Sequence, residues 1–236
     1  MTLAFIFDLD DTLYNQLQAF QYAYYRHFED SDIGVESLYR HFRQYSDEVF
    51  EKTQDGRMSI SEMHLYRITN AVRDFDINLP ERKARSFQED YEYAQRNIRL
   101  SETMTTLLSK LAKAPIVLGM ITNGESDRQR AKIETLGVTQ WIPENHIFIS
   151  GEHGVSKPNR AIFDQVVKQL QLDIEETYYI GDNFENDVLG AANAGWKTIW
   201  FNRRNHIVAA QNEQANINIQ DEDALATAIN HIIASR

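Results

Sequence analysis

The chain has 236 residues, and its 35 Asp and Glu against 24 Lys and Arg give a formal net charge of −11. Nucleic-acid polymers and anionic membranes select basic faces, so this balance argues against both as partners. The absence of cysteine excludes disulfides, thiolate catalysis and thiolate zinc sites. No apolar run approaches the ~20 residues of a membrane span, and no basic segment precedes the first apolar run, so we expect a cytoplasmic protein.

Residues 3–7 form a short apolar run, typical of a buried strand, that ends abruptly in aspartates. Alternate side chains of an extended chain point to the same side, so Asp8 and Asp10 are expected to face one pocket. Two carboxylates aimed at one point repel each other unless a cation lies between them, and Mg²⁺ prefers such oxygen ligands. This stretch therefore predicts a metal-assisted carboxylate site at the carboxyl end of a strand.

Residues 15–98 are polar, aromatic and rich in helix-forming residues, without an alternating strand pattern. We predict about four helices here, over 17–28, over 35–53, from Ser59 onward and after Pro80. A serine followed by an acid in the first turn is typical of a capped helix start, and proline favours the first turn. The segment is expected to form an all-helical domain inserted after the first strand, with its aromatic side chains mostly in its own core.

From residue 99 onward, strand-like apolar runs alternate with helix patterns. The predicted strands are 116–121, 147–149, 177–180, 197–201 and 217–219. The predicted helices are 102–113, 126–136, 158–170, a segment between 182 and 195, and 221–234, with a loop over 202–216. This alternation indicates an α/β fold, with a Rossmann-like parallel-sheet core over residues 1–14 and 99–236 and a helical domain over residues 15–98.

Polar residues follow further predicted strands, at the edge where open parallel sheets bind ligands. Thr122 offers a hydroxyl, and Asn123 and Gly124 offer backbone N–H groups near a helix start, which suits a phosphate anion. Lys157, just before a proline-opened helix, is placed to supply a fixed positive charge. This edge is therefore expected to bind a small phosphorylated metabolite.

Two aspartates of an acidic turn, Asp182 and Asp187, follow another strand and are expected to complete a magnesium site with Asp8. The chemistry-bearing loops, in this order, resemble the motifs of the haloacid dehalogenase-like superfamily, and the resemblance covers essentially the whole chain. The matching stretches are Asp8-Leu9-Asp10-Asp11-Thr12-Leu13, Thr122-Asn123-Gly124, Lys157-Pro158, and Gly181-Asp182 through Asp187. The helical insert resembles the cap domain that such proteins carry between the first and second motifs.

This resemblance implies a phosphatase that uses Mg²⁺ and an aspartyl-phosphate intermediate. It implies that Asp8 is the nucleophile and that Asp10 first protonates the leaving oxygen and then activates water. The catalytic residues implied to hold the phosphate are Thr122 and Lys157. The implied metal ligands are Asp8, the backbone carbonyl of Asp10, Asp182 and, in support, Asp187. The dehalogenase branch lacks an acid at the position of Asp10, so its presence favours phosphoryl transfer.

Similarity of shorter stretches to particular members of this superfamily indicates a class of substrate. The stretches 121–124, 154–159 and 193–195 resemble pyrimidine 5′-nucleotidase-like members, which implies a nucleoside 5′-monophosphate. Gln129 and residues 132–134 also resemble N-acylneuraminate-9-phosphate phosphatases, so this ester or a sugar phosphate is the alternative. Two further classes stay open, a sugar-phosphate mutase with the same nucleophile and a non-enzymatic phosphate-binding regulator.

Substrate contacts are expected beside the catalytic loop and at the phosphate-binding loop. The candidate substrate-binding residues are Tyr14, Asn123 and Gly124.

Overall fold

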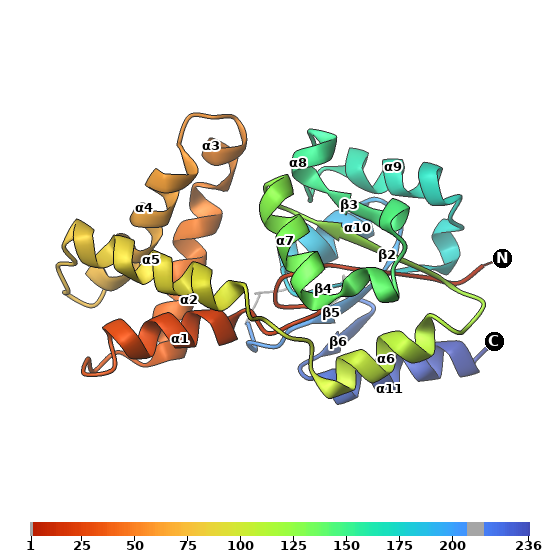
Figure 1. Ribbon diagram of the computed structural model, residues 1–236. Helices are drawn as coiled ribbons and strands as arrows, with labels where there is room; N and C mark the ends of the chain where they lie inside the picture. Colours follow the sequence, from red (N-terminus) through yellow and green to blue (C-terminus); the bar gives the residue numbers. More distant parts are fainter. Residues whose placement is uncertain (1, 207–214) are drawn as a thin grey trace. The chain divides into compact units, whose positions relative to one another are not determined.

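The computed structural model describes residues 2–206 and 215–236. The chain divides into two compact units, a larger one of Met1–Asn15 with Arg99–Arg236 and a smaller one of Gln16–Ile98. Figure 1 shows a sheet with helices in the larger unit and helices alone in the smaller one. Within the described residues, no helix combines the length and the apolar character needed to cross a membrane. The predicted cap role of the smaller unit stays a prediction.

Over residues 2–206 and 215–236, the larger unit is built on a six-stranded sheet in the order β3-β2-β1-β4-β5-β6, and each neighbouring pair is parallel. The strands are β1 (Ala4–Phe7), β2 (Val117–Thr122), β3 (Ile147–Ile149), β4 (Thr177–Gly181), β5 (Lys197–Phe201) and β6 (Ile217–Ile219). Nearly every residue of β1, β2 and β3 is buried and most of them are apolar, as expected for parallel strands covered on both faces. The predicted Rossmann-like parallel fold is confirmed.

The strand order changes direction at β1, which pairs with β2 on one side and β4 on the other. Phe7 is in register with Met120 and Ile180, and the backbone N–H of Asp8 donates to the carbonyl of Ile180 at 2.8 Å. The carboxyl ends of β1, β2 and β4 therefore lie next to one another. Such a reversal point is where open α/β sheets place their ligands.

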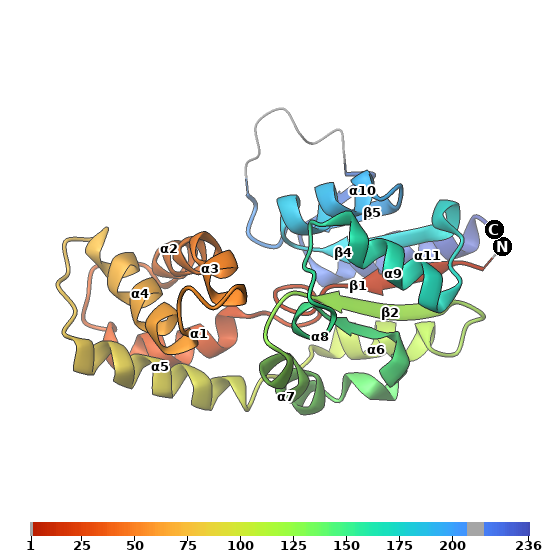
Figure 2. The same ribbon diagram turned by 90° about the horizontal axis from the view of Figure 1, so that it is seen from above.

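Helices cover both faces of this sheet. In Figures 1 and 2, α6 (Glu102–Leu111) and α11 (Glu222–Ala234) lie on one face, and α9 (Arg160–Leu170) and α10 (Gly190–Asn193) lie on the other. The remaining elements of this unit are α7 (Ser126–Leu136), α8 (Ser150–His153), η1 (Val138–Gln140), η2 (Glu144–His146), η3 (Ile174–Glu176) and the π-helix η4 (Phe184–Leu189). Under α9, the rings of Phe163, Tyr179 and Trp196 pack at centroid distances of 5.4 to 6.2 Å.

The smaller unit contains α1 (Leu17–His27), α2 (Val35–Glu48), α3 (Phe50–Gln54), α4 (Ile60–Arg73) and α5 (Glu81–Gln95). Phe20 lies at the centre of its core, and the rings of Tyr39, Phe42 and Phe87 are within 5.4 Å of it. Ser59 caps α4 in a capping box with Glu62, the arrangement that pairs two otherwise unbonded backbone donors. The core prediction is confirmed for the buried aromatic residues, which are Phe20, Tyr24, Phe28, Tyr39, Phe42, Phe87 and Tyr91, whereas Tyr22, Tyr25 and Tyr93 are exposed.

Three elements differ from the sequence prediction. The single helix expected over 35–53 is interrupted at Val49, whose φ of −107° and ψ of 5° end α2 while its side chain is fully buried. The loop expected before Lys157 contains the short helix α8, which ends where Gly154 takes a φ of 65°. The helix expected after Asp182 begins as η4 rather than as an α-helix. The loop predicted over 202–216 lies partly outside the described residues.

Candidate active site

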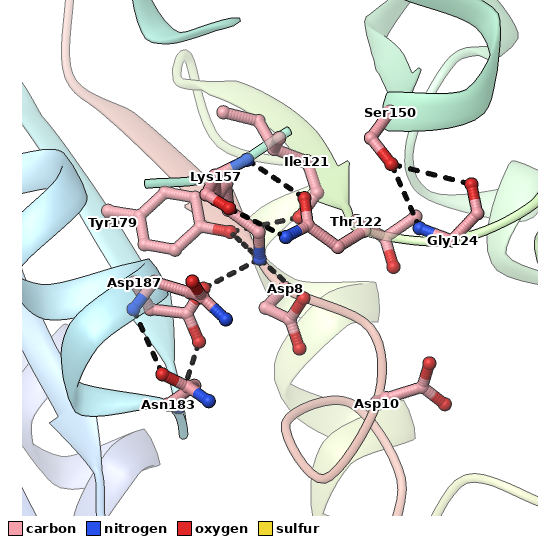
Figure 3. A network of polar contacts seen from close by, with 12 residues as sticks. Asp8, Asp10, Ile121, Thr122, Gly124, Ser150, Lys157, Tyr179, Asn183 and Asp187 are labelled. Atoms are coloured by element: carbon pink, nitrogen blue, oxygen red, sulfur yellow. Dashed lines mark hydrogen bonds and ion pairs between the residues drawn. The ribbon is translucent and has the colours of Figure 1, made fainter. Parts of the chain in front are cut away.

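The buried ammonium of Lys157 joins three side chains at the carboxyl ends of the central strands. Its Nζ donates to Asp8 Oδ1 at 2.7 Å, to Asp187 Oδ1 at 2.6 Å and to the hydroxyl of Tyr179 at 2.8 Å (Figure 3). The Tyr179 hydroxyl in turn donates to the carbonyl of Ile121 at 2.9 Å. Because its proton is committed to that carbonyl, the tyrosine oxygen presents a lone pair to Lys157 and orients the ammonium.

Among the residues that the structure describes, the charges in this cluster do not balance. Burial raises the pKa of Asp8 to about 7, and the carboxylate of Asp187 adds to the rise although Lys157 opposes it. Burial opposes the charge of Lys157 as well, but the carboxylates of Asp187 and Asp8 keep its pKa well above the usual value. One cation is therefore shared between two buried carboxylates, and the site favours additional positive charge.

Three carboxylates of this cluster satisfy the chemistry of a divalent-cation site. Oxygens of Asp8, Asp182 and Asp187 all lie within 4.8 Å of one another. The donors are all oxygens and carry excess negative charge, which fits Mg²⁺. The side chain of Asp10 is not part of this group, and the ligand predicted from Asp10 is its backbone carbonyl.

Local backbone structure places Asp187 in the cluster. Asp187 Oδ2 accepts from the backbone N–H of Asn183 at 2.9 Å, and Asn183 Oδ1 accepts from the N–H of Asn186 at 2.9 Å, which closes the first turn of η4. Gly181 leaves room for this carboxylate, because a Cβ there would lie 2.3 Å from Asp187 Oδ2. A π-helical turn at such a point is typical of functional sites.

The Asp10 side chain points away from Lys157 in Figure 3, and its partners include Gln129 and Lys132 of α7. Its carboxylate accepts from Lys132 Nζ at 2.8 and 2.7 Å, from Gln129 Nε2 at 3.1 Å and from the Tyr14 hydroxyl at 2.5 Å. Burial alone would raise the pKa of Asp10, but the charge and hydrogen bond of Lys132, with Tyr14 and Gln129, lower it to about 2. Asp10 is therefore an ionised carboxylate.

The loop after β2 connects Asp10 with Lys157. Gln129 Nε2 donates to the buried Thr122 Oγ1 at 2.5 Å as well as to Asp10. The Asn123 side chain donates to the carbonyl of Lys157 and accepts from its backbone N–H, both at 2.9 Å. The backbone N–H of Gly124 donates to Ser150 Oγ at 2.9 Å. In this arrangement Asn123 orients Lys157, and the N–H of Gly124 is already used within the chain.

The structure thus brings Asp8, Lys157, Asp182 and Asp187 into one cluster, with Thr122 on the adjacent strand. The predicted substrate contacts of Tyr14, Asn123 and Gly124 stay predictions, and the structure shows these residues bonded to protein groups. Sequence reasoning did not assign a site role to Gln129, Lys132, Tyr179 or Ser150. The sequence does contain a signal for Gln129 and Lys132. They are three residues apart on a helix that begins at Ser126, shortly after Thr122-Asn123-Gly124, and therefore share one face of it.

Known proteins that are similar to this chain are hydrolases, and several of them are phosphatases. Residues 2–195 match the haloacid dehalogenase-like hydrolase family. The chain is 36% identical over 95 residues to the glyceraldehyde 3-phosphate phosphatase of Pyrococcus abyssi, which is 40% of this chain and 39% of that protein. It is 40% identical over 86 residues to the pyrimidine 5′-nucleotidase YjjG of Escherichia coli, 36% of this chain and 37% of that protein.

A further relative is the N-acylneuraminate-9-phosphatase of Rattus norvegicus, 32% identical over 108 residues, 45% of this chain and 42% of that protein. The matches to these three relatives span less than half of each relative's length. Among solved structures, the HAD-hydrolase YfnB of Bacillus subtilis, solved with bound magnesium, has a TM-score of 0.71 at 22% identity. That likeness covers 97% of this chain and 99% of the other and shows the shared fold. Because the family match extends over most of its residues, the chain belongs to the haloacid dehalogenase-like hydrolase family.

Proposed function

We propose that this protein is a Mg²⁺-dependent phosphomonoester hydrolase that acts on a small phosphorylated metabolite through an aspartyl-phosphate on Asp8. The observation that carries the proposal is the cluster of Asp8, Asp182 and Asp187 around the buried Lys157, at the reversal point of the sheet. Phosphate monoesters are among the slowest esters to hydrolyse, and their reaction needs positive charge around the transferring group. This cluster provides both a carboxylate nucleophile and a fixed cation.

In the first step, an Asp8 carboxylate oxygen attacks phosphorus and the bond from phosphorus to the ester oxygen breaks. The departing oxygen takes a proton from Asp10, leaving an alcohol and the aspartyl-phosphate. Asp10 must carry a proton for this step, whereas its pairing with Lys132 keeps it ionised. The acid form of Asp10 therefore requires its contact with Lys132 to loosen when the ester is bound.

In the second step, Asp10 as a carboxylate accepts a proton from water as the water oxygen attacks phosphorus. The acyl-phosphate bond breaks, Asp8 is regenerated and inorganic phosphate leaves. Lys157 and the Thr122 hydroxyl hold the phosphoryl oxygens, and both are buried and held by neighbouring side chains. Such fixed donors stabilise charge without reorganisation during the reaction.

The residues that would hold Mg²⁺ are Asp8, Asp182 and the backbone carbonyl of Asp10, with Asp187 in support. When bound, the ion supplies a Lewis acid for the phosphoryl oxygens and offsets the excess negative charge of the cluster.

The best candidate substrate is a nucleoside 5′-monophosphate, with N-acylneuraminate 9-phosphate or a sugar phosphate as the alternative. The support is the similarity to relatives named as a pyrimidine 5′-nucleotidase and an N-acylneuraminate-9-phosphatase. All such substrates share a phosphate monoester on an alkyl oxygen, and this group is the feature that the site recognises.

The test is phosphate release from a panel of monoesters in Mg²⁺ and in EDTA, for the wild type and Asp8→Asn. The panel contains pyrimidine and purine 5′-monophosphates, sugar phosphates, glyceraldehyde 3-phosphate and N-acetylneuraminate 9-phosphate. We expect Mg²⁺-dependent release that Asp8→Asn abolishes, and the best ester identifies the substrate class. Sugar-to-sugar phosphoryl transfer, a phosphoprotein that persists, or halide release from a 2-haloacid without ester hydrolysis would overturn the proposal.

A further inference from the structure

Asp11, the residue after Asp10, is held in an unfavourable backbone conformation. Its φ is 57°, in the left-handed region, and its side chain is buried. Residues with a Cβ adopt this conformation uncommonly, although Asp tolerates it better than most, and surrounding contacts help to hold it. The loop that carries Asp8 and Asp10 therefore depends on contacts that hold Asp11.

The guanidinium of Arg204, three residues beyond the end of β5, provides these contacts. Its Nη2 donates to Asp11 Oδ1 at 2.7 Å and its Nε to Asp11 Oδ2 at 3.2 Å. Nη2 also donates to Asn15 Oδ1 at 2.7 Å. The Arg204 and Asp11 side chains are 10% and 7% exposed. A planar guanidinium bonded to both oxygens of one carboxylate fixes its direction as well as its distance.

The adjacent Arg203 extends this hold to the rest of the larger unit. Its Nε donates to the backbone carbonyl of Asp11 at 3.4 Å, and its Nη2 to Glu222 Oε1 at 2.9 Å. Glu222 also accepts from the hydroxyl of Ser101. The two arginines thus connect the loop from Asp11 to Asn15 with the first turns of α11 and α6. Asn15 is the residue at which the chain leaves the larger unit.

We propose that Arg204, assisted by Arg203, is a positioning residue for the reaction, which holds the loop of residues 10–15 so that Asp10 stays aligned with Asp8. The inference rests on the proposed function. Any shift of Asp11 moves the backbone of Asp10, whose carbonyl and side chain both have proposed roles. Residues 203 and 204 lie beyond the 2–195 that match the family, so the family match does not extend to them.

The decisive variant is Arg204→Lys. It keeps the positive charge, but a lysine ammonium cannot reproduce the two hydrogen bonds to the Asp11 carboxylate together with the one to Asn15. Arg204→Met removes the charge as well. The matched control is Arg160→Lys, because Arg160 forms an exposed ion pair with Asp164 in the same unit, with 64% of its side chain exposed. Each variant is assayed for kcat and KM on the best alkyl phosphate, for thermal unfolding, and for amide exchange of residues 8–15 without Mg²⁺ or substrate.

For Arg204→Lys we expect kcat to fall by about tenfold or more with KM within about threefold of wild type, because misalignment affects the reacting groups more than the phosphate contacts. In Arg204→Lys, the amides of residues 8–15 should exchange faster than in the wild type, whereas the amides of α9 should exchange at the wild-type rate. In Arg160→Lys, the amides of residues 8–15 and of α9 should both exchange at the wild-type rate. Should Arg204→Met fail to fold, the lysine variant decides.

Wild-type kcat and loop exchange in Arg204→Lys would overturn the inference, as would a fall in unfolding temperature without a change in kcat. If the wild type hydrolyses no ester, the proposed function fails. Amide exchange of residues 8–15 then tests only whether Arg204 holds the loop. Faster exchange would then support it, and unchanged exchange would overturn it.

Discussion

Replacing Lys157 with methionine removes the cation shared by Asp8 and Asp187 while keeping a side chain of similar length. The Lys157 side chain is 3% exposed and that of Asp187 is 1% exposed, so little water reaches the carboxylates left behind. Removing one partner of a buried ion pair costs about 3–5 kcal/mol. We therefore expect Lys157→Met to lower the free energy of unfolding by about 3–5 kcal/mol in EDTA, out of a total of about 5–15 kcal/mol.

Mg²⁺ should offset much of this loss. In the variant, the carboxylates of Asp8 and Asp187 either repel each other or one of them takes up a proton. A divalent cation at Asp8, Asp182 and Asp187 would relieve the repulsion and make the protonation unnecessary. A ligand at 100 times its Kd adds about 2.7 kcal/mol to the stability of the folded state. Because Lys157 already neutralises part of the cluster in the wild type, the increase on adding Mg²⁺ should be larger in the variant.

The assay is urea unfolding at pH 8 in EDTA and in Mg²⁺, for the wild type, Lys157→Met and Lys110→Met. Lys110 is an exposed lysine that bonds to Asn230 and serves as the control. An equal deficit of Lys157→Met in EDTA and in Mg²⁺ would refute the coupling of this lysine to a cation site. A deficit below about 1 kcal/mol would show that the pair does not behave as a buried one.

Gly181→Ala places a Cβ 2.3 Å from Asp187 Oδ2, so we expect Mg²⁺ affinity by calorimetry to fall by about tenfold or more, and unchanged affinity would contradict this. Gly151→Ala places a Cβ 2.8 Å from the carbonyl of Gly124. The resulting shift of the phosphate loop should lower kcat/KM for the best ester about tenfold, which is about 1.4 kcal/mol, and wild-type kinetics would disprove it. Ser59→Ala removes the capping box of α4 and should cost about 1 kcal/mol in urea unfolding, and an unchanged midpoint would exclude the cap as a stabilising contact.

The part of the site carried by strands could be predicted from the sequence. Asp8, Thr122 and Asp182 each come at or directly after the end of an apolar run, and parallel strands bring those ends to one edge of a sheet. Lys157 is predicted on a separate ground, because it precedes a proline and a helix start. The predictions at strand ends need only the direction of each strand, which the alternation of strands and helices supplies.

Contacts made across the sheet edge could not be predicted in this way. Lys132 meets Asp10 across 122 positions of sequence, and Arg204 meets Asp11 across 193. Each contact depends on where α7 or the segment after β5 lies relative to the loop after β1. Hydrophobic periodicity predicts the elements but not their relative positions. The sequence predicts Tyr179 only as a strand residue. The structure pairs β4 with β1, with Tyr179 in register with Ile6, and this arrangement shows its hydroxyl beside Lys157.

The pKa values of Asp8 and Asp10, two residues apart on one loop, are shifted in opposite directions. Burial raises the pKa of Asp8 to about 7, whereas pairing with Lys132 lowers that of Asp10 to about 2. The proposed chemistry needs the reverse, an ionised nucleophile at Asp8 and a protonated acid at Asp10. A divalent cation held by Asp8 would lower the pKa of that carboxyl, and an ester oxygen that draws Asp10 from Lys132 would raise the pKa of Asp10. In the proposed reaction the chain therefore supplies the positions of the two carboxylates, and their charge states depend on the cation and the substrate together.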